Sequence, residues 1–85
     1  MDNRVKELIA IGASITANCQ PCLEYHVAKA RENGAEEEAI KQAITVGKIV
    51  RKGAAGKMDQ YASTMFEDTT ATPDAAEKVD GCQLT

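Results

Sequence analysis

The sequence predicts an all-α fold: a compact helical domain of about four helices that assembles as a homo-oligomer. Apolar residues recur at three- and four-residue spacing through most of the chain, and no stretch alternates as a strand does. With 85 residues there is room for one core. The hydrophobic fraction is 44%, but aromatic residues contribute only 4% and alanine is abundant, so each buried residue removes little area from water. We therefore expect the domain to gain burial from copies of itself.

The first expected helix spans residues 3–17. Its apolar positions are Val5, Leu8, Ile9, Gly12 and Ile15. Asn18 ends or bends this helix. A second helix follows with Pro21 in its first turn, where the missing N–H costs nothing. Asn33 and Gly34 provide the signal that ends the second helix.

Acidic residues at 36–38 favour the first turn of a third helix because they complement its dipole. The apolar positions of this helix are Ile40, Ala43, Ile44, Gly47 and Val50. Gly53 is expected to break it. A fourth helix would then carry its apolar residues at Ala54, Met58, Tyr61, Ala62, Met65 and Phe66. The remaining segment, "TTATPDAAEKVDGCQLT", has few large apolar residues, so we divide the chain into a helical core at 1–68 and a loosely ordered tail at 69–85.

Charge and hydropathy exclude several classes of partner. Ten basic and 13 acidic residues give a net charge of −3, which does not favour binding to nucleic acid. The apolar run at 8–17 follows a segment without net positive charge, unlike a signal peptide, and it is too short to cross a membrane. We therefore expect a cytoplasmic protein with no nucleic-acid and no membrane partner. In a reducing compartment, paired cysteines are more often catalytic or metal-binding than structural.

The segment "ITANCQPCLEYHVAKA" holds two of the three cysteines and the single histidine. Cys19 falls at or just before the N-terminus of the second helix, and Cys22 falls in its first turn. Two intervening residues allow the two sulfurs to meet, and the free N–H groups of a helix start stabilise a thiolate. His26 lies one turn after Cys22 on the same face, where an imidazole can take the thiol proton directly or through a water. The spacing favours a redox dithiol.

Other interpretations of these residues remain open at this stage. The two cysteines and the histidine are compatible with a zinc site that has Cys82 or Glu7 as its fourth ligand, although a second cysteine pair is missing. The cysteines are also compatible with buried, inert thiols. Glu7 is compatible with a surface carboxylate paired with Arg4 or Lys6.

Glu7 precedes Cys19 by twelve positions, which gives the pattern E-x11-C-x2-C-x3-H over Glu7, Cys19, Cys22 and His26. This pattern resembles the alkylhydroperoxidase AhpD-like branch of the carboxymuconolactone decarboxylase family. The segments "NCQPCLEYHVAKARENGA" and "EEEAIKQAITVGKIVRKGAA" are similar to the helical core of that family, and the resemblance covers about residues 3–66. It implies assembly into trimers or hexamers, in agreement with the oligomer expected from the core.

The resemblance also implies an activity, a peroxidase that needs no metal or other cofactor. Cys22 would attack a hydroperoxide and become a sulfenic acid, Cys19 would resolve it as a disulfide, and a dithiol electron donor would reduce that disulfide. Glu7 and His26 would form a proton relay to Cys22. Helix-end electrostatics alone favour Cys19 as the nucleophile, whereas the family pattern and the histidine four residues on favour Cys22.

The sequence departs from the fuller enzymes of this family. Gln20 and Pro21 stand where some members have a histidine between the cysteines, and the chain resembles one minimal unit. Reduction of protein or small-molecule disulfides by the same dithiol is therefore the main alternative activity. Lactone decarboxylation fits less well, because the cysteine pair would have no evident task in it. No role is assigned to Cys82.

Overall fold

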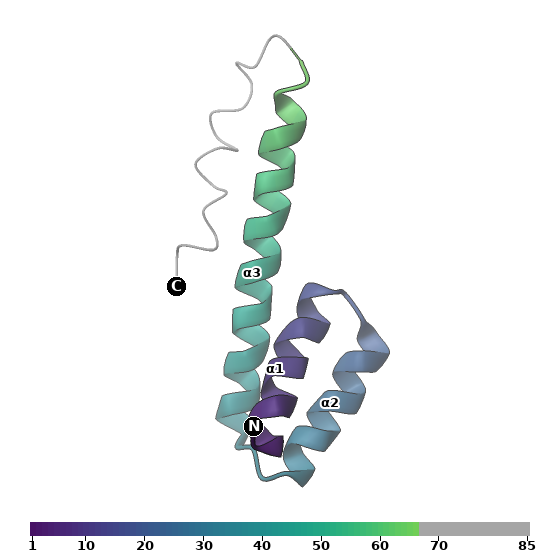
Figure 1. Ribbon diagram of the computed structural model, residues 1–85, viewed down its shortest axis with the longest axis vertical. Helices are drawn as coiled ribbons and strands as arrows, with labels where there is room; N and C mark the ends of the chain where they lie inside the picture. The colour runs from purple at the N-terminus through teal and green to yellow at the C-terminus, as the bar shows by residue number, and fades with distance from the viewer. Residues whose placement is uncertain (67–85) are drawn as a thin grey trace. The chain divides into compact units, whose positions relative to one another are not determined.

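The computed structural model describes residues 1–66 and consists there of three α-helices: α1 (Asn3–Thr16), α2 (Gln20–Glu32) and α3 (Glu37–Ser63) (Figure 1). No strand occurs in this part of the chain, so the predicted all-α class is confirmed. None of these helices is long and apolar enough to cross a membrane. The expected tail at 69–85, with Cys82, lies outside the described residues.

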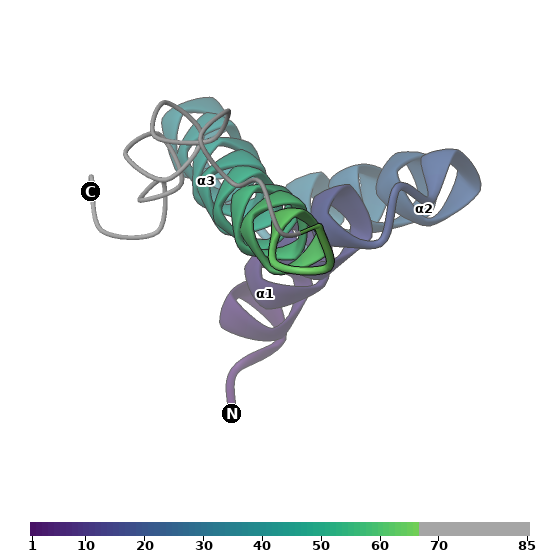
Figure 2. The ribbon, with the colours of Figure 1, turned by 90° about the horizontal axis from the view of Figure 1, so that it is seen from above.

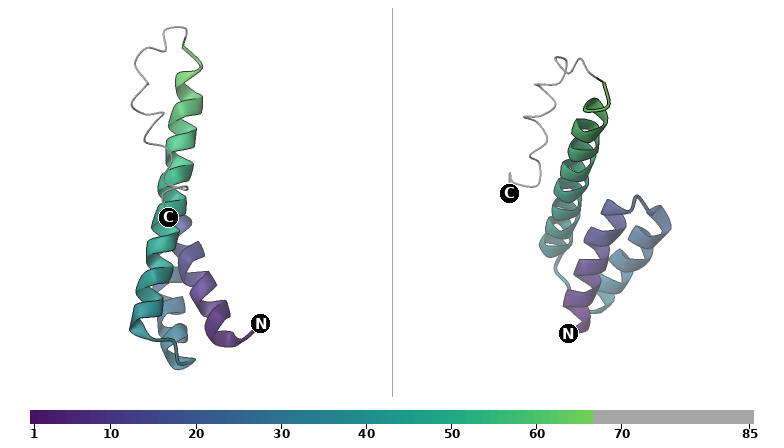
Figure 3. Two further views of the ribbon diagram at one scale, coloured as in Figure 1. Left: turned by 90° about the vertical axis from the view of Figure 1, so that its left-hand side faces the viewer. Right: turned by 45° about the horizontal axis from the view of Figure 1, so that its top comes forward.

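The chain divides into two compact units, Met1–Lys48 and Ile49–Thr85, and α3 runs through the boundary. In the first unit, α1 and α2 lie side by side as a helical hairpin, as the views in Figures 1 and 3 both show. Figure 2 shows the same pair of helices from above. The described part of the second unit is the C-terminal portion of α3 and the turn that follows it.

The predicted break at Gly53 is wrong. A single helix, α3, extends from Glu37 to Ser63, so residues 1–66 contain three helices where about four were expected. A glycine inside a helix costs only about 1 kcal/mol relative to alanine. Gly53 is followed directly by Ala54 and Ala55, two of the best helix formers. The helix propensity of the neighbouring residues therefore outweighs the unfavourable propensity of Gly53.

The helix ends have identifiable causes. Asp2 caps α1, because its Oδ1 accepts two backbone N–H groups of the first turn at 2.7 and 3.3 Å. Asn18 follows α1 with a φ of 56°, a left-handed conformation that cannot continue the helix. Gly34 has a φ of 87° between α2 and α3, and the Asn33 side chain donates to the Lys29 carbonyl at 2.8 Å. The expected stops at Asn18 and at Asn33–Gly34 are thus confirmed.

The core is small. Its buried residues are Ile11, Ala30, Ala35 and Ile40, and partly buried Leu8, Leu23, Val27, Ala43 and Ile44 pack against them. Two of the four buried residues are alanines, so the hydrophobic stabilisation from this cluster is modest. This agrees with the thin core expected from the composition.

An exposed ion pair joins the end of α2 to the start of α3. The Arg31 guanidinium donates two hydrogen bonds to the Glu37 carboxylate, at 2.8 and 3.0 Å. The pair raises the pKa of Arg31 and lowers the pKa of Glu37 below its ordinary value. Both side chains are more than half exposed, so solvent screens the attraction and the pair orients the connection more than it stabilises the fold.

Helices α1 and α3 approach closely at two glycines within the first unit. A Cβ atom added to Gly47 would lie 2.6 Å from the carbonyl oxygen of Gly12 and 2.8 Å from the Cβ of Ile15. At the same crossing, Thr16 Oγ1 lies 3.0 Å from the Gly12 carbonyl and 3.4 Å from the Gly47 carbonyl. The absence of a side chain at 47 is therefore what lets the two backbones meet.

Replacement of this glycine is expected to destabilise the domain. Gly47→Ala would force α1 and α3 apart, so we expect the free energy of unfolding to fall by about 1–3 kcal/mol, measured by urea denaturation followed by circular dichroism. Gly12→Ala is the matched control, because its added Cβ meets only the Ala43 carbonyl at 3.4 Å. The control should change stability by less than about 1 kcal/mol. Equal stability of the two variants would contradict the close crossing.

Candidate active site

The two cysteines lie together at the start of α2. Cys19 is the N-cap residue and Cys22 is in the first turn, as the sequence predicts. Their sulfurs form a disulfide, and their Cα atoms are 5.2 Å apart. The Sγ of Cys19 also accepts the backbone N–H of Cys22 at 3.2 Å. Both residues are partly exposed, so this dithiol is accessible from solution.

Backbone contacts hold Cys19 between the two helices of the hairpin. Its N–H donates to the carbonyl of Ser14 in α1 at 3.0 Å, and its own carbonyl accepts the N–H of Leu23 in α2 at 3.0 Å. The N-cap sulfur is therefore fixed relative to both helices without a contribution from the side-chain core.

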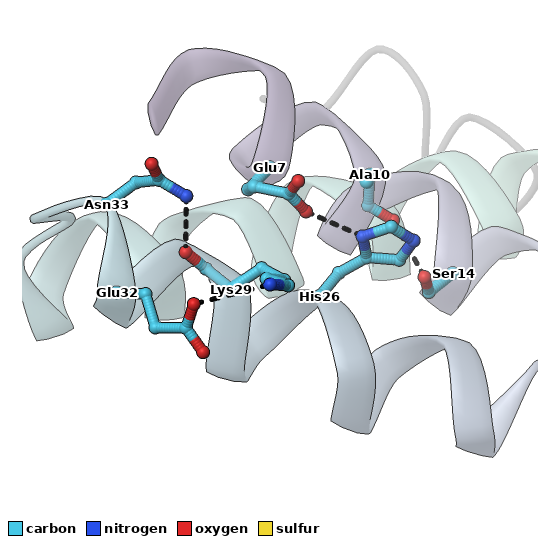
Figure 4. Close-up of polar contacts among 7 residues, drawn as sticks. All are labelled: Glu7, Ala10, Ser14, His26, Lys29, Glu32 and Asn33. Carbon is cyan, nitrogen blue, oxygen red and sulfur yellow. Dashed lines mark hydrogen bonds and ion pairs between the residues drawn. The ribbon is translucent and has the colours of Figure 1, made fainter. Parts of the chain in front are cut away.

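Glu7 and His26 meet across the hairpin. Glu7 Oε1 lies 2.6 Å from His26 Nδ1, and the two side chains are 13% and 29% exposed (Figure 4). Glu7 thus has the predicted histidine as its partner, which replaces the alternative of a surface carboxylate paired with a neighbouring base. A carboxylate can only accept hydrogen bonds, so in a neutral imidazole the proton is on Nδ1 and the lone pair is on Nε2.

His26 lies one helical turn after the cysteine pair. Cys22 lies four residues before His26 on α2, on the same helical face. Long side chains in a helix lean towards its N-terminus, so the imidazole leans towards the turn that contains Cys22. The site therefore combines a dithiol at a helix start, a base one turn away and a carboxylate that orients the base. Such a set can activate a thiol as a nucleophile.

Tyr25 and Lys29 border the imidazole on the exposed side. The rings of Tyr25 and His26 meet edge to face with centroids 5.0 Å apart, and Lys29 Nζ lies 5.7 Å from the centre of the Tyr25 ring. Lys29 also pairs with Glu32 at 3.3 Å, which raises the pKa of Lys29 (Figure 4). Tyr25 is 57% exposed, so its ring contacts the histidine and leaves much of its own surface in solvent.

The zinc alternative gains no support from the described part of the chain. Among residues 1–66, no three histidine, cysteine, aspartate or glutamate side chains form a group that could hold a metal ion. Cys82, considered from the sequence as a fourth ligand, lies outside those residues.

Sequence reasoning missed one residue near the site, Ser14. It is 4% exposed, and its hydroxyl donates to the Ala10 carbonyl at 2.7 Å (Figure 4). Its carbonyl is the acceptor for the backbone N–H of Cys19. The available signal was its spacing, seven residues after Glu7 and so on nearly the same face of α1.

Comparison with known proteins places this site in a family. The sequence profile of the carboxymuconolactone decarboxylase family matches residues 1–57, a range that contains both cysteines, His26 and Glu7. The chain belongs to the carboxymuconolactone decarboxylase family. The resemblance inferred from the E-x11-C-x2-C-x3-H pattern is thereby confirmed at the level of the family.

A curated relative of this family member is "Uncharacterized protein 4 in cox locus" from Paracoccus denitrificans. It is 44% identical over 55 residues, which are 65% of the present chain and 50% of the relative. The chain thus spans about half the length of the curated relative that it matches. No solved structure gives a significant match.

Loss of the Glu7 charge is expected to lower the reactivity of the dithiol. In Glu7→Gln, the amide still occupies the space, but the charge-assisted bond to a protonated His26 is lost. Such bonds contribute about 1.5–3 kcal/mol, so we expect alkylation of Cys22 by iodoacetamide in the reduced protein to slow roughly tenfold or more. Peptide mass spectrometry can measure the rate at each thiol.

Glu24→Gln is the matched control for this variant. Glu24 is an exposed carboxylate on α2, so its loss removes the same charge without touching the histidine. Similar alkylation rates in the two variants would mean that Glu7 does not act on the dithiol through His26.

Proposed function

We propose that the protein is a thiol-dependent peroxidase that reduces hydroperoxides through the Cys19–Cys22 dithiol. The observation that carries this proposal is the 2.6 Å contact between Glu7 and His26, one helical turn from the cysteine disulfide. A disulfide alone fits many redox proteins, whereas a dithiol with an oriented base fits a reaction in which a thiol must lose its proton. Membership in a family with alkylhydroperoxidase members adds support.

The first step would use Cys22 as the nucleophile. His26 takes the Cys22 thiol proton on Nε2, while Glu7 holds the proton on Nδ1. The thiolate attacks the terminal oxygen of the hydroperoxide, the O–O bond breaks, and Cys22 becomes a sulfenic acid. The departing alkoxide takes the proton from His26 and leaves as an alcohol, or as water when the substrate is hydrogen peroxide.

The remaining steps would regenerate the thiols. The Cys19 thiol attacks the Cys22 sulfenic acid, a sulfur–sulfur bond forms, and water leaves. A dithiol donor then reduces the disulfide by thiol–disulfide exchange and is itself oxidised to a disulfide. One hydroperoxide and one dithiol are thus converted into an alcohol, a water and a disulfide, without a metal or organic cofactor. A reducing cytoplasm would supply such a donor.

A second candidate activity is reduction of protein or small-molecule disulfides. It is favoured by the position of Cys19, whose sulfur accepts a backbone N–H at the N-cap of α2. A thiolate at this position is stabilised by the helix start, as in proteins that exchange disulfides. The two activities share the dithiol and differ in which cysteine attacks first.

We further propose that the chain acts as a homo-oligomer, a trimer or hexamer. In the first unit, side chains that are 38–57% exposed include Val5, Ile9, Tyr25 and Val46. In the second unit, side chains that are 43–69% exposed include Val50, Met58, Tyr61, Met65 and Phe66. Exposed apolar residues on this scale, beside so small a core, favour burial against further copies.

Substitution of each cysteine by serine tests the peroxidase. Cys22→Ser should abolish peroxide consumption in the presence of a dithiol, because Cys22 is the thiol that His26 is proposed to deprotonate. Cys19→Ser should accumulate a sulfenic acid at Cys22 after one equivalent of hydrogen peroxide, detected by dimedone labelling and peptide mass spectrometry.

The same variants separate the two candidate activities. A Cys22→Ser protein that still consumes peroxide at the wild-type rate would refute the peroxidase proposal. If the wild-type protein reduces a model disulfide but no hydroperoxide, and Cys19→Ser removes that activity, the reductase is the correct assignment.

Oligomer formation is tested by light scattering during size-exclusion chromatography. We expect the wild-type protein to elute with the mass of three or six chains, and Ile9→Asp to shift it towards smaller species because the charge opposes burial of that exposed side chain. Ile9→Leu is the control and should leave the mass unchanged. A monomeric wild-type protein would contradict the proposal.

A further inference from the structure

We propose that Ser14 is a positioning residue for His26. After His26 takes the thiol proton on Nε2, the hydroxyl oxygen of Ser14 accepts a hydrogen bond from that N–H. The significance of this bond for turnover rests on the proposed peroxidase function. The hydrogen bond itself does not depend on that function, and it is measurable in protein whose His26 has been protonated by lowering the pH.

Helix geometry places Ser14 on the required side of the imidazole. Ser14 follows Glu7 by seven residues, about two turns of α1, so both face α2. The ring of His26 leans towards the N-terminus of α2, and the turn between the helices brings that end beside the C-terminal part of α1, where Ser14 lies. Figure 4 shows the Ser14 hydroxyl on the side of the His26 ring that faces away from Glu7.

The hydrogen bonding of Ser14 leaves its oxygen available as an acceptor. A hydroxyl has one proton to donate and two lone pairs to accept with, and the Ser14 proton is donated to the Ala10 carbonyl at 2.7 Å. The residue is 4% exposed, so bulk water does not compete for those lone pairs. Because the Ser14 hydroxyl already donates its proton, its oxygen can only accept a further hydrogen bond. It therefore interacts favourably with an Nε2 that carries a proton and not with an Nε2 that carries a lone pair.

A purely structural role explains the serine poorly. Alanine has the higher helix propensity and would bury no polar atom at this position. The hydroxyl therefore lowers the stability of α1 slightly. The Ser14 carbonyl also accepts the N–H of Cys19, so one residue borders both the dithiol and its base.

The test uses the single histidine of the chain, which gives one set of imidazole resonances. In protein labelled with nitrogen-15, we expect the Nε2 resonance of protonated His26 to move in Ser14→Ala, while Nδ1 keeps the signature of its bond to Glu7. Thr45→Ala is the matched control, because Thr45 makes the same kind of backbone bond, to the Lys41 carbonyl at 3.1 Å, on an exposed face of α3. It should leave both resonances in place.

Kinetics provide a second readout. Loss of one hydrogen bond to the protonated base should lower kcat for peroxide reduction about three- to tenfold in Ser14→Ala with little change in KM, whereas Thr45→Ala should match wild type. An unchanged Nε2 resonance in folded Ser14→Ala would overturn the proposal, whatever the activity.

Two further results keep the proposals separable. If Ser14→Ala does not fold, the proposal is tested in the wild-type protein. We expect a nuclear Overhauser contact between the Ser14 β protons and the Hε1 proton of His26. The absence of this contact would overturn the proposal. If wild type reduces no hydroperoxide, the proposed function fails, while the Nε2 comparison still establishes or refutes the Ser14–His26 contact.

Discussion

The turn between α1 and α2 sets the geometry on which the whole site depends. Asn18 takes a left-handed conformation, and the N–H of Cys19 then bonds the carbonyl of Ser14. These contacts fix the register of two rigid helices, so that Glu7 lies opposite His26 well away from the turn. A shift of one residue along either helix would rotate its side chains by about 100° and separate carboxylate from imidazole. The backbone of the turn therefore aligns a carboxylate and an imidazole that belong to two different helices.

The same turn explains why a sulfur stands at the start of α2. The N-cap position is normally taken by serine, threonine, aspartate or asparagine, whose oxygens accept N–H groups strongly. Here Cys19 takes that position and accepts at 3.2 Å through sulfur, a weaker acceptor. The helix start thus has a weaker cap, and the N–H of Cys22 donates to a sulfur of the cysteine pair. Reactivity and local stability compete at this one residue, and its chemistry favours reactivity.

The sequence predicts the local features well because they depend on residues a few positions apart. Spacing, caps and turns predict the helices α1 and α2 of the hairpin and the helix α3 that follows it. They also predict the stops at Asn18 and Gly34 and the place of the cysteines in α2. The contact of Glu7 with His26 was predictable only through the family pattern, since nothing local pairs residues nineteen positions apart. Gly53 was misjudged because helix continuity depends on the summed preference of its neighbours. Ser14 was missed because the burial of one hydroxyl depends on how two helices pack.

The placement of the disulfide also bears on the proposed cycle of oxidation and reduction in a domain with so small a core. The Cα atoms of Cys19 and Cys22 are 5.2 Å apart, a separation that the first turn of a helix adopts and that suits a disulfide. The N–H of Leu23 remains bonded to the carbonyl of Cys19 while the sulfurs are joined, so α2 is intact in the oxidised state. For the proposed cycle, this means that the backbone of the first turn is compatible with the disulfide and need not unwind to form it. The proposed function therefore requires no movement of helices that a few alanines and isoleucines hold together.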